Sequence, residues 1–256
     1  CDIVNMKSPL QIPVATISYL KDEYDISDSE IQLAAIILCD GSIDTHRINV
    51  FKSFNRNGND LIVECLEDLE IPYIHDIVTN TNGFGIPNYI TEINRYRFNK
   101  SNCPDRIKYI TKNVIPDWVF QLSRRQANIF IETWAQFDGH ERDYACKKLQ
   151  VDSYELANQL QHVCVLAGYG SRITERSIGN NKKSTIYVIP YVRSVKSCKH
   201  VSKVSYNGIV WCPSTDAGIV IYRKDNKIFI SGNSPFVNIS LFDRPKLEQL
   251  FEHNPD

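Results

Sequence analysis

Two helices of the same unusual design constrain this chain more than any other feature. Each is a mainly apolar run that ends in Asp-Gly, one at residues 33–41 and the other at residues 131–139. A carboxylate at the end of a buried helix raises the free energy of the folded chain unless it meets a positive charge or a metal ion. Because the arrangement occurs twice, we predict that Asp40 and Asp138 form one shared acidic site. A single Asp-Gly would indicate only a helix end followed by a turn.

The small side chains in the first of these helices bear on how the two pack. Ala34 and Ala35 allow a second helix to approach closely, and ridges-into-grooves packing then brings the two helix ends side by side. Two carboxylates at short range repel each other unless divalent cations neutralise them, and ligand sets made only of oxygen favour Mg²⁺. Metal ions that bridge such carboxylates and a phosphate can activate water for hydrolysis.

The surroundings of the two Asp-Gly helices also repeat. Alternating residues at 42–52 predict a strand, and residues 60–69 predict a helix. After the second Asp-Gly, residues 148–151 predict a strand, residues 153–166 an amphipathic helix capped by Ser153, and residues 169–173 a further strand. The period is 98 residues, 138 minus 40. We therefore predict an internal duplication that forms a pseudo-two-fold α/β (α+β) domain.

These paired motifs resemble the LAGLIDADG homing endonucleases, in the two-motif form usually found inside inteins. The resemblance implies that residues 26–195 form an endonuclease domain that works as a monomer, because both halves lie in one chain. It implies cleavage of double-stranded DNA at an intein-free copy of a host gene, with Mg²⁺ bound by Asp40 and Asp138. A central lysine often organises water around the metal ions in this family, and Lys100 and Lys182 are the candidates.

The predicted strands carry side chains suited to nucleic acid. A twisted antiparallel ribbon can enter the major groove of DNA, where base edges are distinguishable. The candidates for DNA contact are Arg47, Asn49, Lys52, Arg95, Arg97 and Lys183. The formal net charge of −1 excludes a uniformly basic chain, so a positive surface must be local. Without the resemblance, these side chains would be interpreted as ordinary solvated charges.

Residues 196–233 resemble the carboxy-terminal splicing segment of inteins. The segment is predicted to be small, all-β and Hint-like, and it ends in Gly-Asn followed by Ser. Asn233 can cyclise through its side-chain amide and release the chain beyond it, and Ser234 offers a hydroxyl that accepts an acyl group. Cys212 matches a position that assists acyl transfer in the family, although a small buried thiol is an equal alternative. The penultimate His of the family is Gly232 here.

The two ends of the chain complete the intein interpretation. Residues 1–25 resemble the end of an amino-terminal splicing half, and we expect the rest of that half to be a missing partner. Residues 234–256 resemble a segment of ribonucleotide reductase, which would be the host protein. An endonuclease-dead fragment that acts only in protein trans-splicing is one alternative function. A non-catalytic DNA-binding protein of the same fold is another.

Composition is typical of a globular protein of the cytoplasm, where we expect this chain to reside. Hydrophobic residues make up 43% of the sequence and charged residues 23%. The longest apolar runs are too short to span a bilayer, so no membrane partner is expected. The eight cysteines include no Cys-x-x-Cys pair and are predicted to be free thiols.

Overall fold

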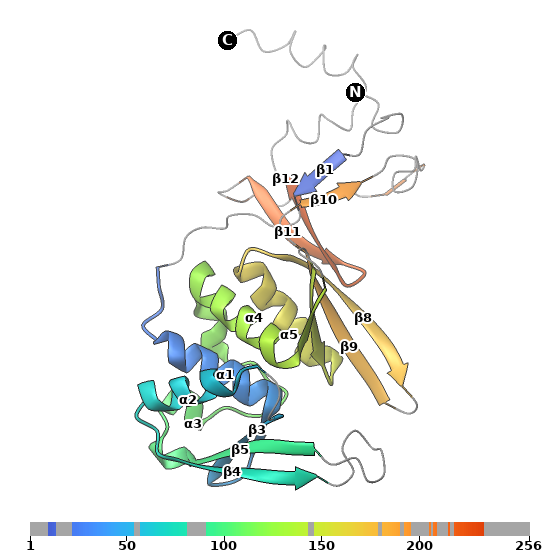
Figure 1. Ribbon diagram of the computed structural model, residues 1–256. Coiled ribbons are helices and arrows are strands. Elements are labelled where there is room, and N and C mark those ends of the chain that lie inside the picture. Colours follow the sequence, from blue (N-terminus) through green and yellow to red (C-terminus); the bar gives the residue numbers. More distant parts are fainter. Residues whose placement is uncertain are drawn as a thin grey trace.

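The computed structural model describes residues 10–13, 22–53, 57–80, 91–142, 146–178, 181–189, 192–195, 205, 207–208, 215 and 218–232 (Figure 1). Two units of the same order follow each other, which confirms the predicted duplication. The first unit comprises α1 (Asp28–Asp40), β2 (Gly41–Ile43), β3 (Arg47–Ser53), α2 (Asn59–Asp68), β4 (Tyr73–Asn80) and β5 (Thr91–Asn99). The second comprises α4 (Arg124–Asp138), β6 (Gly139–Arg142), β7 (Cys146–Val151), α5 (Tyr154–Leu166), β8 (Gly170–Ile178) and β9 (Asn181–Ile189).

Each unit forms an antiparallel sheet with the same strand order. The first sheet runs β2-β3-β5-β4, and the second contains the equivalent order β6-β7-β9-β8. Helix α1 packs on β3, and α5 packs on β8 and β9, so helices cover one face of each sheet. Figure 1 shows the helices of both units gathered together, with one sheet below them and the other beside them. The opposite face of each sheet carries no helix within the described residues.

The three longest helices begin at serine caps, which explains where the sequence starts them. The hydroxyl of Ser27 accepts a hydrogen bond from the backbone N of Glu30, and that of Ser123 accepts one from the backbone N of Gln126. Both are capping boxes, because the third residue of each helix bonds back to the cap. The predicted cap at Ser153 is confirmed by its bond from the backbone N of Leu156. Within the described residues, no helix is long and apolar enough to cross a membrane.

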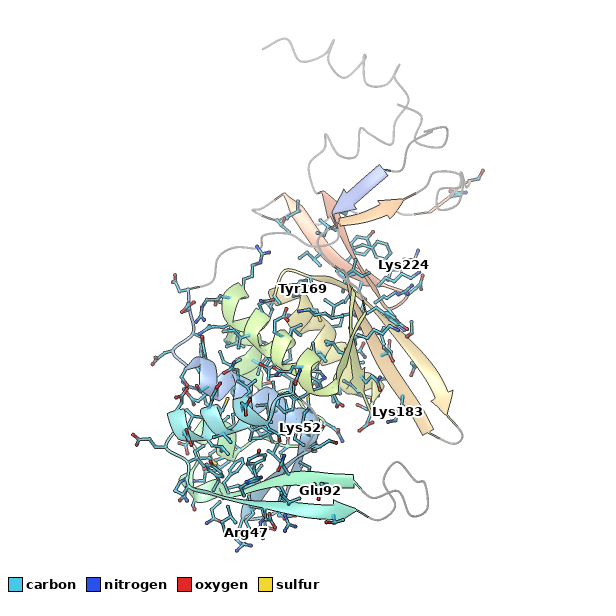
Figure 2. All side chains as sticks on the ribbon, viewed as in Figure 1. Arg47, Lys52, Glu92, Tyr169, Lys183 and Lys224 are labelled. Carbon is cyan, nitrogen blue, oxygen red and sulfur yellow. The ribbon has the colours of Figure 1, made fainter. Side chains whose placement is uncertain are left out.

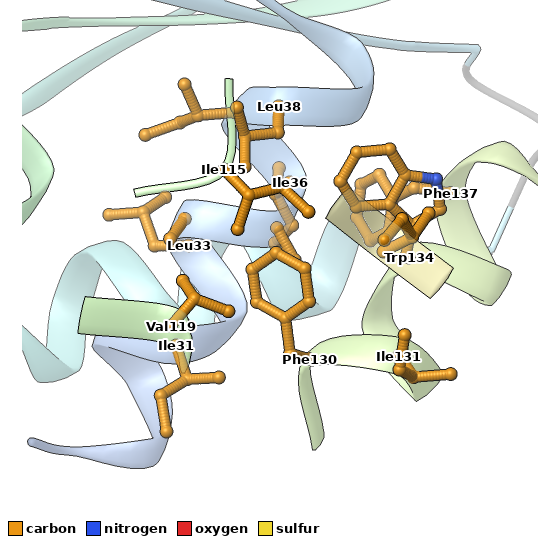
Figure 3. Packing of buried hydrophobic residues seen from close by; sticks show 14 of the residues in the cluster. Ile31, Leu33, Ile36, Leu38, Ile115, Val119, Phe130, Ile131, Trp134 and Phe137 are labelled. Carbon is orange, nitrogen blue, oxygen red and sulfur yellow. The ribbon is translucent and has the colours of Figure 1, made fainter. Parts of the chain in front are cut away.

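The core lies where α1 and α4 pack against each other. Ala34 and Ala35 are fully buried, as the predicted close approach of the helices requires. Figure 3 shows Ile36 of α1 beside Phe130 and Trp134 of α4 in this layer. The α1–α4 pair is therefore the interface between the two units.

A connector between the units fills one side of this helix pair. It contains η3 (Lys100–Asn102), α3 (Asp105–Lys108) and η4 (Asp117–Gln121). Five of its apolar side chains are buried in the core: Ile107, Ile110, Ile115, Val119 and Leu122. Among the residues that the structure describes, this segment has no repeat partner, so the two-fold relation is seen in the two units alone.

The predicted carboxy-terminal segment is described in part, and that part extends the second sheet. Strands β11 (Ile219–Lys224) and β12 (Lys227–Gly232) form a hairpin, and β12 pairs with β8 at Lys227 and Arg172. The hairpin turn at Asn226 explains the docking. Its carbonyl accepts hydrogen bonds from the backbone N of Ile173 and from Gln161, and its side chain bonds to Tyr154. The described hairpin is thus continuous with the second unit, in contrast to the separate all-β segment that we predicted.

The glycine of each Asp-Gly motif is explained by close contact with the preceding helix. A Cβ atom at Gly41 would lie 2.4 Å from the carbonyl oxygen of Ile37, and one at Gly139 would lie 2.2 Å from that of Ala135. These atoms belong to the backbone and cannot move aside cheaply. The chain needs glycine here because it turns from helix into strand without an intervening residue.

We expect Gly41→Ala and Gly139→Ala each to lower the free energy of unfolding by about 1–3 kcal/mol, the usual cost of forcing extra atoms into a packed site. Urea unfolding monitored by circular dichroism measures this change. Ser42→Ala, at an exposed position one residue further on, is the matched control and should change stability by less than about 0.5 kcal/mol. Equal effects of Gly41→Ala and Ser42→Ala would contradict the steric explanation.

Candidate active site and nucleic-acid interface

Asp40 and Asp138 are the last residues of α1 and α4, the two helices that pack together in the core. Both carboxylates are half-buried at the end of the helix pair. Burial raises the pKa of the Asp138 carboxyl above its usual value, and the negative charges of Asp40 and Asp152 raise it further. The two predicted acids therefore interact electrostatically at one site.

A buried lysine stands beside the first acid. The Nζ atom of Lys52 lies 3.0 Å from Oδ2 of Asp40 and 3.4 Å from the carbonyl oxygen of Phe137, and it sits 3.9 Å above the centre of the Phe137 ring. Its side chain is only 3% exposed, on the helix-facing side of β3. Its ammonium group therefore connects the end of α1 to the end of α4. The assignment of Lys52 to DNA contact is corrected accordingly, because its side chain points into the protein and is paired there.

A second lysine, Lys112, lies at the end of α1. Its Nζ atom donates hydrogen bonds to the carbonyl oxygens of Ile37, Leu38 and Cys39 at 3.1, 2.6 and 2.9 Å. These carbonyl groups belong to the last turn of the helix, where that of Ile37 also accepts from the backbone N of Gly41, so the ammonium group caps the helix and offsets its negative dipole end. Burial lowers the pKa of Lys112, whereas the charges of Asp138, Asp40 and Asp152 act in the opposite direction. Sequence reasoning missed Lys112 because it lies in the connector, outside any periodic element.

The two lysines are not related by the duplication. Lys52 stands two residues beyond the strand partner of Gly41, and the equivalent position beyond the partner of Gly139 is Val151. Val151 is buried. The acids are thus duplicated, but the positive charges around them come from one strand and from the connector. The site is chemically asymmetric.

One of the two lysines that we predicted for catalysis, Lys100, lies away from the acids. Lys100 is in η3, where its backbone N bonds to the carbonyl oxygen of His46, at the end of β3 remote from Lys52. Lys182 is on β9, paired with Ser177 near the tip of the β8–β9 hairpin, and its side chain lies outside the described residues. The structure therefore places Lys52 and Lys112, and not Lys100, beside the acids. The sequence did contain a signal for Lys52, because the alternation of β3 places this lysine on the same side of the strand as the apolar Ile48 and Val50.

The oxygen donors at this site fit a hard divalent cation. The two carboxylates supply oxygen atoms, which are the ligands that Mg²⁺ prefers, whereas the helix-end carbonyl groups of Ile37, Leu38, Cys39 and Phe137 accept hydrogen bonds from the two lysines. The nearby thiol does not compete, because burial and the charges of Asp138 and Asp40 hold the pKa of Cys39 well above its usual value and keep it protonated. Within the described residues, no cluster of three or more His, Cys, Asp or Glu side chains forms a complete protein ligand set. A bound ion would therefore need water or substrate oxygens as further ligands.

Four of the predicted DNA contacts lie on the helix-free face of the first sheet. Along β3 and β5, alternate residues are buried under the helices, and the residues between them face the open side. The open positions carry Arg47, Asn49, Arg95 and Arg97. Figure 2 shows Arg47 on the first sheet and Lys183 on the second, with Lys52 between them near the helices.

The helix-free face of the second sheet carries a cluster that sequence reasoning missed. Tyr187 on β9 lies between its two strand partners, Lys148 on β7 and Arg172 on β8. The Nζ atom of Lys148 is 5.2 Å from the centre of the tyrosine ring, and Cζ of Arg172 is 4.7 Å from it. The exposed Lys183 lies further along the same strand as Tyr187. Positive charge is thus concentrated on the open faces although the net charge is −1.

The predicted splicing residues fall outside the description. Asn233, Ser234 and Cys212 are not among the described residues, and β12 ends at Gly232, immediately before Asn233.

No family model and no curated protein matches this chain. Among solved structures, it is similar to full-length DUF199/WhiA from Thermatoga maritima, with 11% identity over 66% of this chain and a TM-score of 0.42. The match spans about half of that protein, 53% of its length. The chain is also similar to I-DmoI in complex with DNA and Mn, with 11% identity, coverage of 63% of this chain and 90% of that chain, and a TM-score of 0.43. The homing endonuclease I-WcaI bound to its DNA recognition sequence has 15% identity, with coverage of 67% of this chain and 80% of that chain, and a TM-score of 0.41. At these low scores, the similarities assign neither a family nor an activity to this chain.

Because the pKa of Asp138 is raised in the folded protein, we expect its ionisation to lower the free energy of unfolding in a pH-dependent way. The unfolded chain releases the Asp138 proton near its ordinary pKa of about 3.9, whereas the folded protein releases it at higher pH. Between these values the unfolded state binds fewer protons, so stability falls as pH rises through the window and stays lower above it. We expect Asp138→Asn, which cannot ionise, to raise the free energy of unfolding at pH 7 in metal-free buffer.

Urea unfolding at pH 7 and at pH 4 measures this effect. The advantage of Asp138→Asn over the natural chain should shrink at the lower pH. Asp44→Asn, at an exposed residue of the β2–β3 turn, serves as the control. A difference between Asp138→Asn and the natural chain that is the same at both pH values would rule out ionisation of Asp138 as the cause.

Proposed function

We propose that this chain is a metal-dependent endonuclease that cuts double-stranded DNA. The observation that carries the proposal is the placement of Asp40 and Asp138 at the adjoining ends of α1 and α4, with buried Lys52 and Lys112 beside them. Buried charges of both signs at a helix end do not stabilise a fold efficiently, and such groups cluster where chemistry is carried out.

The residues of the site have separable roles in this proposal. Oxygen atoms of Asp40 and Asp138 would hold Mg²⁺, which would supply an activated water and stabilise the leaving oxygen of a phosphodiester. Lys52 holds Oδ2 of Asp40 in place by its hydrogen bond, and Oδ1 would bind the metal ion. Lys112 offsets the negative end of α1, so the site can accept the added charge of a DNA phosphate.

The two open sheet faces suit the shape and charge of a DNA duplex. Arg47 and Asn49 on the first sheet, and Lys148 and Arg172 on the second, can reach phosphates and base edges. An antiparallel ribbon of this kind fits the major groove. Since one chain supplies both sheets and both acids, a monomer is sufficient to address both strands. The target in this proposal spans the insertion point in an uninterrupted host gene.

We expect Asp40→Asn to abolish DNA cleavage and to leave DNA binding intact, because it removes a metal ligand without changing the open sheet faces. The substrate is a duplex that joins the coding sequences on either side of the inserted segment, incubated with Mg²⁺ and the purified chain. Gel electrophoresis detects double-strand breaks, and mobility shift in EDTA measures binding. Lys100→Met is the matched control and should cut normally.

Two outcomes would count against the proposal. Cutting by Asp40→Asn at the natural rate would show that the paired acids do not catalyse the reaction. Binding without cutting by the natural chain, with the correct flanks present, would favour a non-catalytic DNA-binding protein of this fold.

Protein splicing is a second candidate, and one observation favours it. Strand β1 (Leu10–Pro13) pairs antiparallel with β10 (Val192–Val195), from Leu10 opposite Val195 to Pro13 opposite Val192. The segments before α1 and after β9 therefore meet as adjacent strands, as the two connections of an inserted domain do, although the chain returns to the second sheet through β11 and β12. In splicing, the amide nitrogen of Asn233 would attack its own carbonyl carbon, breaking the peptide bond to Ser234 and freeing the amine of Ser234. Residues 234–256 would then belong to a host protein of the ribonucleotide reductase kind.

When this sequence is expressed within its natural reading frame, we expect cleavage after Asn233, and Asn233→Ala should prevent it. Alanine has no side-chain nucleophile, so the peptide bond to Ser234 cannot be released by cyclisation. Intact-mass spectrometry distinguishes the cleaved from the uncleaved chain, and Asn238→Ala controls for nonspecific effects. An uncleaved natural product would exclude this function.

A further inference from the structure

An acidic side chain interrupts the positive surface of the first sheet. Asp76 on β4 lies directly opposite Arg95 on β5 in the antiparallel register. Arg95 donates from Nε to Oδ1 of Asp76 at 3.0 Å and from Nη2 to Oδ2, so the pair is bidentate. The Nε atom of Arg97 lies 3.6 Å from the same Oδ1. All three side chains are about one-third exposed, at 34%, 30% and 31%.

Stability does not explain the position of Asp76. An ion pair exposed to this degree contributes little to folding, because water screens it and ordering both side chains opposes it. Its cost for DNA binding is larger, because a carboxylate on this face repels phosphates and neutralises an arginine that would otherwise attract them. The hydrogen bond from Arg95 lowers the pKa of the Asp76 carboxyl, so the charge persists at neutral pH.

The geometry of the Asp76–Arg95 pair indicates a role in base recognition. A guanidinium group has five N–H donors in a rigid, planar fork. Asp76 uses the Nε hydrogen and one Nη2 hydrogen of Arg95. The hydrogens that remain, on Nη1 and on the far side of Nη2, form the other edge of the fork. Two parallel donors of this kind match O6 and N7 of guanine in the major groove.

We infer that Asp76 positions Arg95 to recognise one guanine in the DNA target, an inference that rests on the proposed DNA binding. Asp76 fixes the plane of the guanidinium group before DNA arrives, so less side-chain freedom is lost on binding to the base. The same carboxylate disfavours phosphate contact by Arg95 and so suppresses binding to other sequences. Asp76 acts as a positioning residue, and Arg95 makes the base contact.

The test is selection of bound duplexes from a pool of random sequence, followed by sequencing, with the natural chain and its variants in EDTA. The natural chain should select a motif with guanine at a position that depends on Arg95. Asp76→Asn should reduce the guanine preference at that one position by about tenfold. It should also raise the affinity for random-sequence duplex and steepen its salt dependence, because one net negative charge is lost from the face.

Two further variants separate the roles. Arg95→Lys keeps the charge but loses the fork, so it should abolish the guanine preference and retain binding to random duplex. Glu92→Gln removes the same charge from β5 at a position in the helix-facing register, and it should leave the selected motif unchanged. Circular dichroism establishes that each variant is folded.

The outcomes distinguish this inference from the proposed function. If the natural chain selects a motif that Asp76→Asn and Arg95→Lys both reproduce, the role of Asp76 is overturned while DNA binding stands. If the natural chain binds no duplex DNA, the proposed function fails, and this inference fails with it. Loss of guanine preference in both variants, with nonspecific binding raised in Asp76→Asn, is the expected result.

Discussion

The close packing of α1 against α4 is the contact on which the rest of this protein depends. Both helices place their small or apolar side chains in the shared core, so their carboxy-terminal ends emerge together. Asp40 and Asp138 occupy those ends, where burial and mutual repulsion keep the pKa of Asp138 raised. Each strand that follows begins at a glycine whose missing Cβ makes room for the last helical turn. One helix contact thus sets both the distance between the acids and the start of both sheets.

The duplicated scaffold carries a site that is not duplicated. Lys52 reaches Asp40 and the end of α4, whereas the equivalent position in the second unit is the apolar Val151. Lys112 caps the end of α1 from the connector, which has no repeat in the described part of the chain. Similar backbones therefore place the acids at equivalent positions, whereas the Lys52 ammonium group bonds to both helix ends and the Lys112 ammonium group bonds to the end of α1. This asymmetry gives the two acids different electrostatic surroundings.

The distribution of charge over the faces of this protein is more informative than its net charge. The chain is close to neutral, yet the helix-free faces carry Arg47, Arg97, Lys148 and Arg172, with Tyr187 held between two of the cations. The acidic Asp76 lies on the open side of the first sheet and accepts hydrogen bonds from Arg95. A surface of this kind can combine local attraction for phosphates with selectivity for base edges.

Local pattern determined much of this protein: the duplicated units, the serine cap at Ser153, the paired acids and the alternation that puts Arg95 and Arg97 on one face. These features follow from periodicities of 3.6 and 2 residues, which can be recognised within one short segment of the sequence. Only the tertiary structure assigned Lys52 to the acids and not to DNA, found Lys112, and joined the β11–β12 hairpin to the second sheet. The physical reason is that these depend on contacts between residues far apart in the chain. The Nζ atom of Lys112 meets carbonyl groups more than seventy residues away, and no local propensity encodes that meeting.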